Sequence, residues 1–195
     1  MELQLRGITK RFPGVLANDR IDLTVRSGET LGLLGENGAG KTTLMNILYG
    51  LYSADEGSIL IDGEEQHFSG PGDAIAGGIG MVHQHFMLVP VLSVVENVIL
   101  GLPTGKTPVL DLAAATEKLA ALAGQTGLAV QPGARVWQLP VGVQQRVEIL
   151  KFLYRGTDIL ILDEPTAVLT PDEITRFFTV LKQLQSQGVT VILIT

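Results

Sequence analysis

The segment Gly35-Glu36-Asn37-Gly38-Ala39-Gly40-Lys41-Thr42 fits the pattern G-x-x-x-x-G-K-[S/T] at every fixed position. Glycines in such a loop let successive backbone N–H groups curl around phosphate oxygens, and the following helix N-terminus adds a partial positive charge. We expect Lys41 to reach the β- and γ-phosphates, and the Thr42 hydroxyl to complete a Mg²⁺ shell. The alternative, a glycine-rich turn before an ordinary helix, requires a chance match on the order of one per cent. We predict that this loop, with Thr43, binds ATP or a close relative.

Two carboxylates, Asp163 and Glu164, directly follow the apolar run 159–162. A carboxylate at the C-terminal end of a parallel strand lies on the sheet edge where ligands collect, the same edge as the phosphate loop. There Asp163 can hold Mg²⁺ through water, and Glu164 can polarise an attacking water molecule. Taken alone, the pair is equally consistent with a helix cap or a turn before Pro165. With the phosphate loop present, we predict the catalytic role.

Further side chains could contact a nucleotide. Gln84 follows the short apolar run 79–82, and its amide oxygen is suited to ligating Mg²⁺ and sensing the γ-phosphate, although alone it would be an ordinary loop residue. Phe12 lies in a turn after the first predicted strand, where it either stacks on a purine ring or belongs to the core. His83 and His85 have no third ligand, so we assign them structural or surface roles.

These residues need an α/β core to position them. Alternating or continuous apolar residues predict strands at 2–9, 19–25, 30–34, 57–61, 79–82, 159–162 and 189–194. Helical spacing and capping residues predict helices at 41–49, 93–100, 111–123, 143–154 and 172–187. The last two strands are continuous apolar runs, which is typical of parallel strands buried on both faces. The pattern indicates an α/β fold interrupted by a helical insertion of roughly 70 residues.

Composition excludes several other classes of protein. Hydrophobic residues make up 46% and charged residues 17% of the 195 residues, which is typical of a folded globular chain. The net charge of −6 and the pI near 5.0 disfavour nonspecific binding to DNA or RNA. The absence of cysteine excludes disulfides, thiol nucleophiles and cysteine-based metal sites. No secretory signal is visible, and the apolar window 86–102 is too short and too polar to span a membrane.

Together these residues resemble the ATPase subunit of ATP-binding-cassette (ABC) transporters over essentially the whole chain. The matching elements are Phe12, the phosphate loop, Gln84, Leu139 to Arg146 and Ile159 to Glu164. The resemblance implies a P-loop (RecA-like) core with an antiparallel β-subdomain, at 1–85 and 156–195, and an inserted helical subdomain at 86–155 that contacts a membrane partner. The stretches 81–88 and 163–171 resemble importers of nucleosides and simple sugars. Their ATPases usually carry two tandem cassettes, of which this would be the first.

The chain departs from the family pattern at three places. The signature that usually begins Leu-Ser-x-Gly-[Gln/Glu] is Leu139-Pro140-Val141-Gly142-Val143 here, and Pro140 lacks both a hydroxyl and a backbone N–H. Gly142 could still face ATP on the opposite cassette, so we expect the chain's own site to be sound and the opposite site to be weakened. Thr170 replaces the usual D-loop Asp, which affects communication between the sites. The switch histidine is expected beyond Thr195, which suggests a truncated domain that binds ATP but hydrolyses it poorly.

The resemblance also implies cofactors, partners and a location. We expect ATP and Mg²⁺ as cofactors, a second cassette (tandem or dimeric) and transmembrane permease subunits as partners, a solute-binding protein as an indirect partner, and no nucleic acid. The domain itself should be soluble and act peripherally at the cytoplasmic face of the cell membrane. The apolar strip 86–89 either docks on the permease or belongs to the core of the helical subdomain.

Other functions compete with this one. The alternatives are a hydrolysis-poor regulatory cassette, which Pro140 favours, and a soluble ABC ATPase acting on nucleic acid, which the acidic charge disfavours. A small-molecule P-loop kinase would have no use for Gln84 or for the stretch 139–146.

Overall fold

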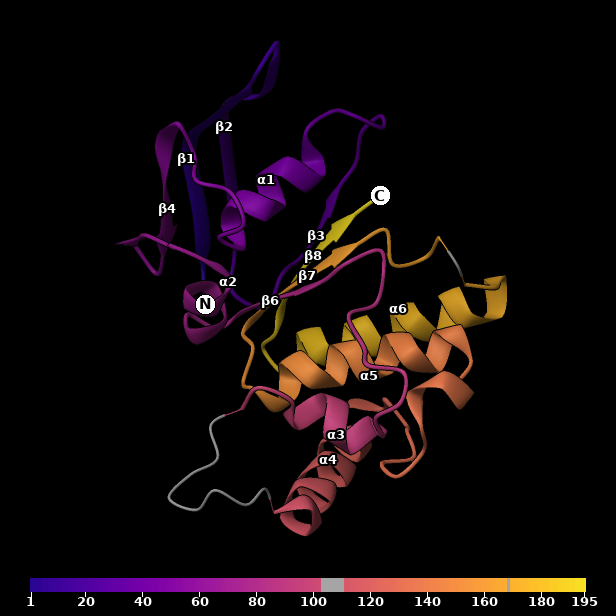
Figure 1. Ribbon diagram of the computed structural model, residues 1–195. Helices are drawn as coiled ribbons and strands as arrows, with labels where there is room; N and C mark the ends of the chain where they lie inside the picture. Colours follow the sequence, from indigo (N-terminus) through magenta and orange to yellow (C-terminus); the bar gives the residue numbers. More distant parts are fainter. Residues whose placement is uncertain (103–110, 168) are drawn as a thin grey trace. The chain divides into compact units, whose positions relative to one another are not determined.

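The chain forms two compact units in a computed structural model that describes residues 1–102, 111–167 and 169–195 (Figure 1). The core unit comprises Met1–Gln84, Thr157–Pro165 and Leu184–Thr195, and the helical unit comprises His85–Gly156 and Thr166–Gln183. Val168, which belongs to the importer-like stretch, lies outside the described residues, as do residues 103–110 of the predicted helical subdomain.

The first sheet of the core unit is antiparallel and carries Phe12 at one end. Its strand order is β2 (Val15–Val25), β1 (Leu3–Phe12), β4 (Glu56–Ile61) and β5 (Glu64–Gln66). A tight turn at Asp62-Gly63 joins β4 to β5 in an antiparallel hairpin. The prediction that β1 ends at residue 9 is wrong. Phe12 still pairs with Val15, because the backbone pairing of β1 with β2 continues through a section whose exposed side chains leave no burial pattern.

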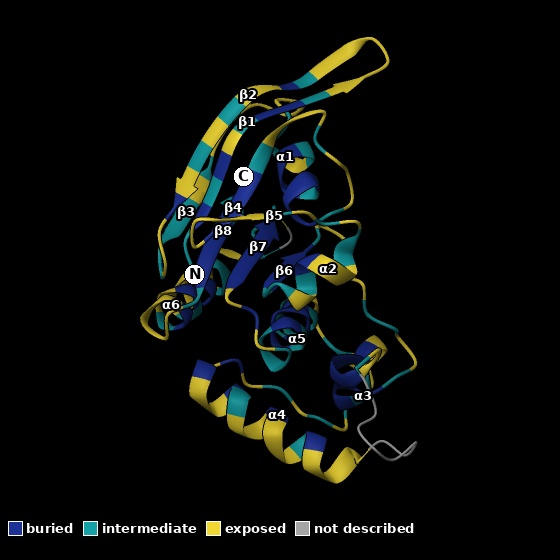
Figure 2. Ribbon diagram, turned by 90° about the vertical axis from the view of Figure 1, so that its left-hand side faces the viewer, coloured by how far each residue is buried: buried dark blue, intermediate teal, exposed yellow. Residues whose placement is uncertain are grey.

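The second sheet of the core unit is parallel and buried. Its strand order is β3 (Thr30–Leu33), β8 (Thr190–Ile194), β7 (Ile159–Asp163) and β6 (Ile79–Val82). Every residue of β6 and β7 is buried, and Figure 2 shows both strands in dark blue. Strand β7 is buried throughout and β8 at every residue except Leu193, which confirms the prediction that the last two strands are parallel and buried on both faces. Because the strands are parallel, the residues that follow β3, β7 and β6 emerge at the same edge of the sheet.

Helix α1 (Lys41–Leu48) holds the two sheets together. Its apolar side chains at positions 44, 45, 47 and 48 belong to one buried cluster with residues of β1, β4, β6, β7 and β8. The helix therefore begins at the phosphate loop and packs its apolar face into the centre of the core unit. A second helix of this unit, α2 (Pro71–Ala76), was not predicted, because six residues with Gly72 among them are too short to show helical periodicity.

The helical unit contains α3 (Val94–Ile99), α4 (Leu112–Thr126), a 3₁₀ turn (Val136–Gln138), α5 (Val141–Tyr154) and most of α6 (Pro171–Ser186). Helix α3 begins with a capping box, in which Glu96 N–H donates to Ser93 Oγ and Ser93 N–H donates to Glu96 Oε2. Helix α4 buries only one narrow side, as Figure 2 shows.

Residues 166–183 fall in the helical unit, although we expected them in the core. The periodicity of α6 indicates a buried face but not which neighbour covers it. One contact that ties α6 to the helical unit is the hydrogen bond from Gln183 Nε2 to the Gln125 carbonyl, at 2.7 Å.

Candidate nucleotide-binding site

The phosphate loop joins β3 to α1 through left-handed turns at Gly38 and Gly40, both with a φ of 84°. Gly40 is also tightly packed, because a Cβ there would overlap the carbonyl oxygen of Ala17 and lie 2.9 Å from Asn18 Nδ2. No atom lies within 4 Å of the corresponding position at Gly38. Strand β2 thus fixes the path of the loop, and Asn18 adds a hydrogen bond of 3.2 Å to the Gly40 carbonyl.

The beginning of α1 presents donors to this loop. No side chain caps the helix, and its first turn contains no acidic residue, so the first N–H groups and the helix dipole are uncompensated by side chains. Lys41 is the first residue of the helix, and its Nζ curls back to donate to the carbonyls of Gly35 and, at 3.0 Å, Glu36. The loop therefore combines backbone donors and an ammonium group in one place, which suits an anion.

The end of β7 meets the second residue of α1. Asp163 is 9% exposed, and its carboxylate lies beside the side chain of Thr42. Burial raises the pKa of Asp163, and the negative charge of Glu164 raises it further. The Thr42 hydrogen bond and the charges of His83 and Lys41 lower the same pKa. The structure thus brings together Thr42 and Asp163, the two predicted metal-binding oxygens that are furthest apart in the sequence.

Glu164 and Gln84 also meet at this edge of the sheet. Gln84 Nε2 donates to Glu164 Oε2 at 3.0 Å, across a separation of 80 residues. Glu164 has a φ of 46°, a left-handed conformation that costs a non-glycine residue about 1–2 kcal/mol. Its backbone N–H donates to the Ile194 carbonyl at 3.0 Å, which helps to hold that conformation. The carboxylate is therefore fixed from both its backbone and its side chain.

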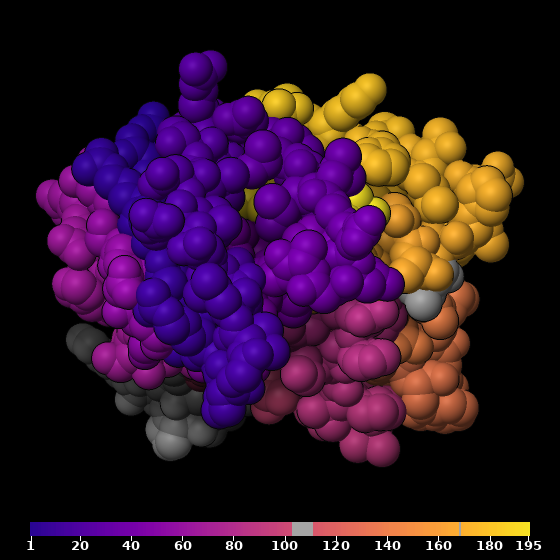
Figure 3. All heavy atoms as spheres, turned by 90° about the horizontal axis from the view of Figure 1, so that it is seen from above, coloured from indigo at the N-terminus to yellow at the C-terminus, as the bar shows by residue number. Residues whose placement is uncertain are grey.

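An open cavity of about 550 Å³ lies beside the loop. Its lining comprises Phe12, Val15, Leu16, Ala17, Asn37 to Thr43, Glu164 and Ile194. Figure 3 shows the hollow between the indigo β1–β2 hairpin and the purple phosphate loop, with yellow atoms of the last strand at its base. Phe12 is 36% exposed and packs edge-on against Tyr52 with 5.5 Å between ring centroids. Its exposure places it on the cavity wall and not in the core.

Several predicted site residues do not line this cavity, namely Gly35, Glu36, Gln84, Asp163 and Gly142. Gly142 belongs to the helical unit, where a Cβ would lie 2.7 Å from Glu173 Oε1, so packing alone accounts for a glycine there. His83 packs its ring against Tyr49 with 5.8 Å between ring centroids. Across the described ranges, no three His, Cys, Asp or Glu side chains are grouped so that they could hold a metal ion.

Sequence reasoning missed Asn18, Val15 and Leu16. Asn18 is 5% exposed in a strand, and a polar residue at a buried strand position is a signal that could have identified it. Val15 and Leu16 are 60% and 51% exposed beside Phe12, and alternation alone does not distinguish such residues from ordinary surface positions.

The fold and this site define an ATP-binding cassette. A family model described as ABC transporter matches residues 18–167, and the chain belongs to that family. It is therefore a nucleotide-binding domain, and the predicted P-loop core with an antiparallel β-subdomain and helical insertion is confirmed.

The chain is similar to curated import proteins. It is 50% identical over 99% of its length to the glucose import ATP-binding protein TsgD13 of Haloferax volcanii, covering 40% of that protein. It is 52% identical over 99% of its length to the nucleoside import ATP-binding protein NupA of Lactococcus lactis, covering 38% of that protein. The chain thus spans about two fifths of the length of these relatives.

Solved structures confirm the fold. The ADP conformation of MJ1267, an ATP-binding cassette of an ABC transporter, has a TM-score of 0.88 at 25% identity, covering 100% of this chain and 81% of that one. The dimeric structure of MJ0796, a bacterial ABC transporter cassette, has a TM-score of 0.82 at 27% identity, covering 99% and 87%. No helix in the described part of this chain is long and apolar enough to cross a membrane.

Proposed function

We propose that the chain hydrolyses ATP with Mg²⁺ and thereby powers the import of a sugar or nucleoside through membrane permease subunits. The observation that carries the proposal is the convergence of the phosphate loop, the Thr42–Asp163 pair and the Gln84–Glu164 pair on one edge of the parallel sheet. The importer branch is supported by relatives that are named for glucose and nucleoside import.

The residues at the cavity fit a nucleoside triphosphate. The cavity volume of about 550 Å³ is within the usual range for a small-molecule site. Phe12 offers an exposed aromatic face for the purine, and the loop N–H groups with Lys41 face the phosphates. Glu164 is positioned to accept a proton from attacking water, and Gln84 orients the Glu164 carboxylate.

Thr42 and Asp163 are the residues that would hold Mg²⁺. Gln84 lies near this pair because it donates a hydrogen bond to Glu164, the residue after Asp163. The donor set fits this ion because Mg²⁺ takes one or two protein oxygens and completes its shell with phosphate and water. When bound, the ion neutralises charge on the transferred phosphoryl group. Asp163 has a raised pKa, so Mg²⁺ and the proton compete for the same carboxylate.

We further propose that a second cassette completes each ATP site, as the dimeric structure of the related MJ0796 suggests. The cassette would act at the cytoplasmic face of the membrane, where permease subunits and, indirectly, a solute-binding protein are its partners. Pro140 is the N-cap residue of α5 and makes no side-chain capping bond, so this chain would contribute a weakened signature to the opposite site.

Binding and transport can be tested separately. A fluorescent ATP analogue should bind the chain, and Lys41→Ala should lose that binding while the matched surface variant Lys182→Ala retains it. In the complete transporter reconstituted with its permease, Glu164→Gln should keep ATP binding but abolish uptake of radiolabelled ribose, glucose or guanosine. Uptake that survives Glu164→Gln would contradict the proposed function.

The weakened signature has its own test. Restoring Pro140→Ser together with Val143→Gln should raise ATPase and uptake rates of the complete transporter. Unchanged rates would show that the signature substitution does not limit turnover. The isolated chain should hydrolyse ATP slowly, and robust turnover that Glu164→Gln abolishes would contradict the need for a second cassette.

A further inference from the structure

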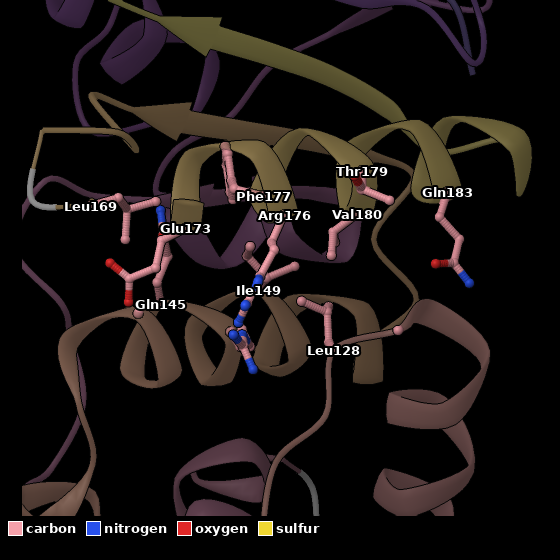
Figure 4. Close-up of a pocket in the computed structure, with 13 residues that line it drawn as sticks. Leu128, Gln145, Ile149, Leu169, Glu173, Arg176, Phe177, Thr179, Val180 and Gln183 are labelled. Carbon is pink, nitrogen blue, oxygen red and sulfur yellow. The ribbon is translucent and has the colours of Figure 1, made fainter. Parts of the chain in front are cut away.

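A separate cavity of about 420 Å³ lies inside the helical unit, between α5 and α6 and beside the end of α4 (Figure 4). All of its lining residues belong to the helical unit, and none of them lines the nucleotide cavity. Its volume is large enough for a small organic molecule.

The floor of this cavity is apolar. Leu128, Ile149 and Phe177 are 1%, 0% and 7% exposed, so these side chains are already held in place by the surrounding helices. Figure 4 shows Phe177 and Val180 on α6 opposite Ile149 on α5. The half-buried side chains of Leu169 and Val180, which also line the cavity, supply the apolar surface that a bound ligand would remove from water.

The mouth of the cavity is cationic. Arg146 on α5 and Arg176 on α6 both line it, and Figure 4 shows Arg176 extending from α6 towards α5. Neither guanidinium is within 4.0 Å of a carboxylate among the described side chains. Arg146 Nη1 makes a long hydrogen bond of 3.4 Å to the Ala129 carbonyl, which uses one of the five N–H donors of the guanidinium.

The one acidic residue of the lining is committed to its own helix. Glu173 Oε2 accepts hydrogen bonds from the Thr170 N–H and hydroxyl, both at 2.9 Å, in a capping box at the start of α6. These hydrogen bonds lower the pKa of Glu173 and keep it ionised and in place. Glu173 therefore does not neutralise both arginines, and the mouth retains a net positive charge.

We propose that this cavity binds a small amphipathic carboxylate, with an aromatic or branched aliphatic body on the floor and the carboxylate on Arg176 and Arg146. Guanidinium groups bind carboxylates through paired hydrogen bonds, which explains the preference for an anion. The apolar floor excludes inorganic phosphate and other fully polar anions as good ligands. The site is independent of the nucleotide cavity and does not rest on the proposed transport function.

Phenylacetate is a suitable probe, and its binding to the 195-residue chain can be measured by isothermal titration calorimetry and by amide chemical shifts in NMR spectra. We expect one site, with shifts at the residues that line the cavity. Arg176→Gln should weaken binding about tenfold or more, as expected for loss of a charge-assisted hydrogen bond. Phenylacetamide has the same shape without the charge, so it should bind the unmodified chain about tenfold or more weakly than phenylacetate does.

Lys182→Gln is the matched control, because Lys182 is an exposed cation of the same helix that does not line the cavity. It should bind phenylacetate like the unmodified chain. Arg176 is exposed, so its replacement should leave thermal unfolding unchanged, and Arg176→Lys should give an intermediate affinity. The proposal is overturned if phenylacetate does not bind up to its solubility limit, if Arg176→Gln and Lys182→Gln bind it equally, or if saturating ADP displaces it.

Discussion

The variant Gly40→Ala should lose both stability and nucleotide binding, because two independent requirements meet at this residue. Its φ of 84° costs a non-glycine residue roughly 1–2 kcal/mol. The new Cβ would also overlap the Ala17 carbonyl oxygen, which belongs to the backbone of β2 and cannot rotate away. Relieving such an overlap by backbone shifts costs on the order of 1–3 kcal/mol, so the total is about 2–5 kcal/mol.

The free energy of unfolding of a folded domain is typically about 5–15 kcal/mol. A loss of this size is a large fraction of it, so urea unfolding should show the loss clearly. Because the overlap is relieved by moving the loop away from β2, the N–H groups that face the phosphates move as well. The affinity for a fluorescent ATP analogue should therefore fall together with the free energy of unfolding.

Gly38→Ala separates the two causes. Gly38 has the same φ of 84°, but no atom lies within 4 Å of its Cβ position. This variant should lose only the conformational part, roughly 1–2 kcal/mol, and should keep most of its nucleotide affinity. Equal losses of stability in Gly38→Ala and Gly40→Ala would refute the packing argument.

Three further variants test the site and the helical unit. Asp163→Asn removes a buried carboxylate with a raised pKa, so urea unfolding at neutral pH should show a more stable chain, and the advantage should shrink as the pH falls through that raised pKa. Mg²⁺ titrations of Asp163→Asn should show weaker Mg²⁺-dependent ATP binding than the unmodified chain. Equal Mg²⁺ affinity in the two proteins would exclude Asp163 as a ligand. Gln84→Ala frees Glu164 and should lower the ATPase rate of the complete transporter about tenfold or more, with little change in ATP affinity; an unchanged rate would exclude the orienting role. Ser93→Ala removes the α3 cap and should cost about 1 kcal/mol in urea unfolding, whereas Ser93→Thr should be nearly neutral. The hydrogen bonds from Ser93 lower the pKa of Glu96, so their contribution is present above the usual pKa of a glutamate and is lost as the pH falls. Ser93→Ala removes only the hydroxyl and leaves the backbone N–H and Arg135 in place, so it should reduce this acid dependence in part, and an acid dependence equal to that of the unmodified chain would contradict the role of the hydroxyl.

Local sequence patterns were sufficient to predict those elements whose defining residues all lie within one short segment. The loop between β3 and α1 and the fully buried strands β6 and β7 could be predicted because glycine spacing and continuous apolar runs are local properties. The Ser93 capping box was equally local. Predictions failed where the deciding contact is distant: the far end of β1 depends on pairing with β2, and the placement of α6 depends on a partner that its own periodicity does not specify.

For the site, the sequence by itself determined which chemical groups are present: a glycine-rich phosphate loop, a lysine, and carboxylates that follow an apolar strand. Only the tertiary structure decided which of them meet. The sheet order β3-β8-β7-β6 brings the strand ends to one edge, so Gln84 reaches Glu164 and Thr42 reaches Asp163. The tertiary structure also places Asn18, on β2 of the other sheet, against the phosphate loop. The physical reason is that spacing along the chain records local periodicity, whereas these contacts depend on how separate strands pair and pack.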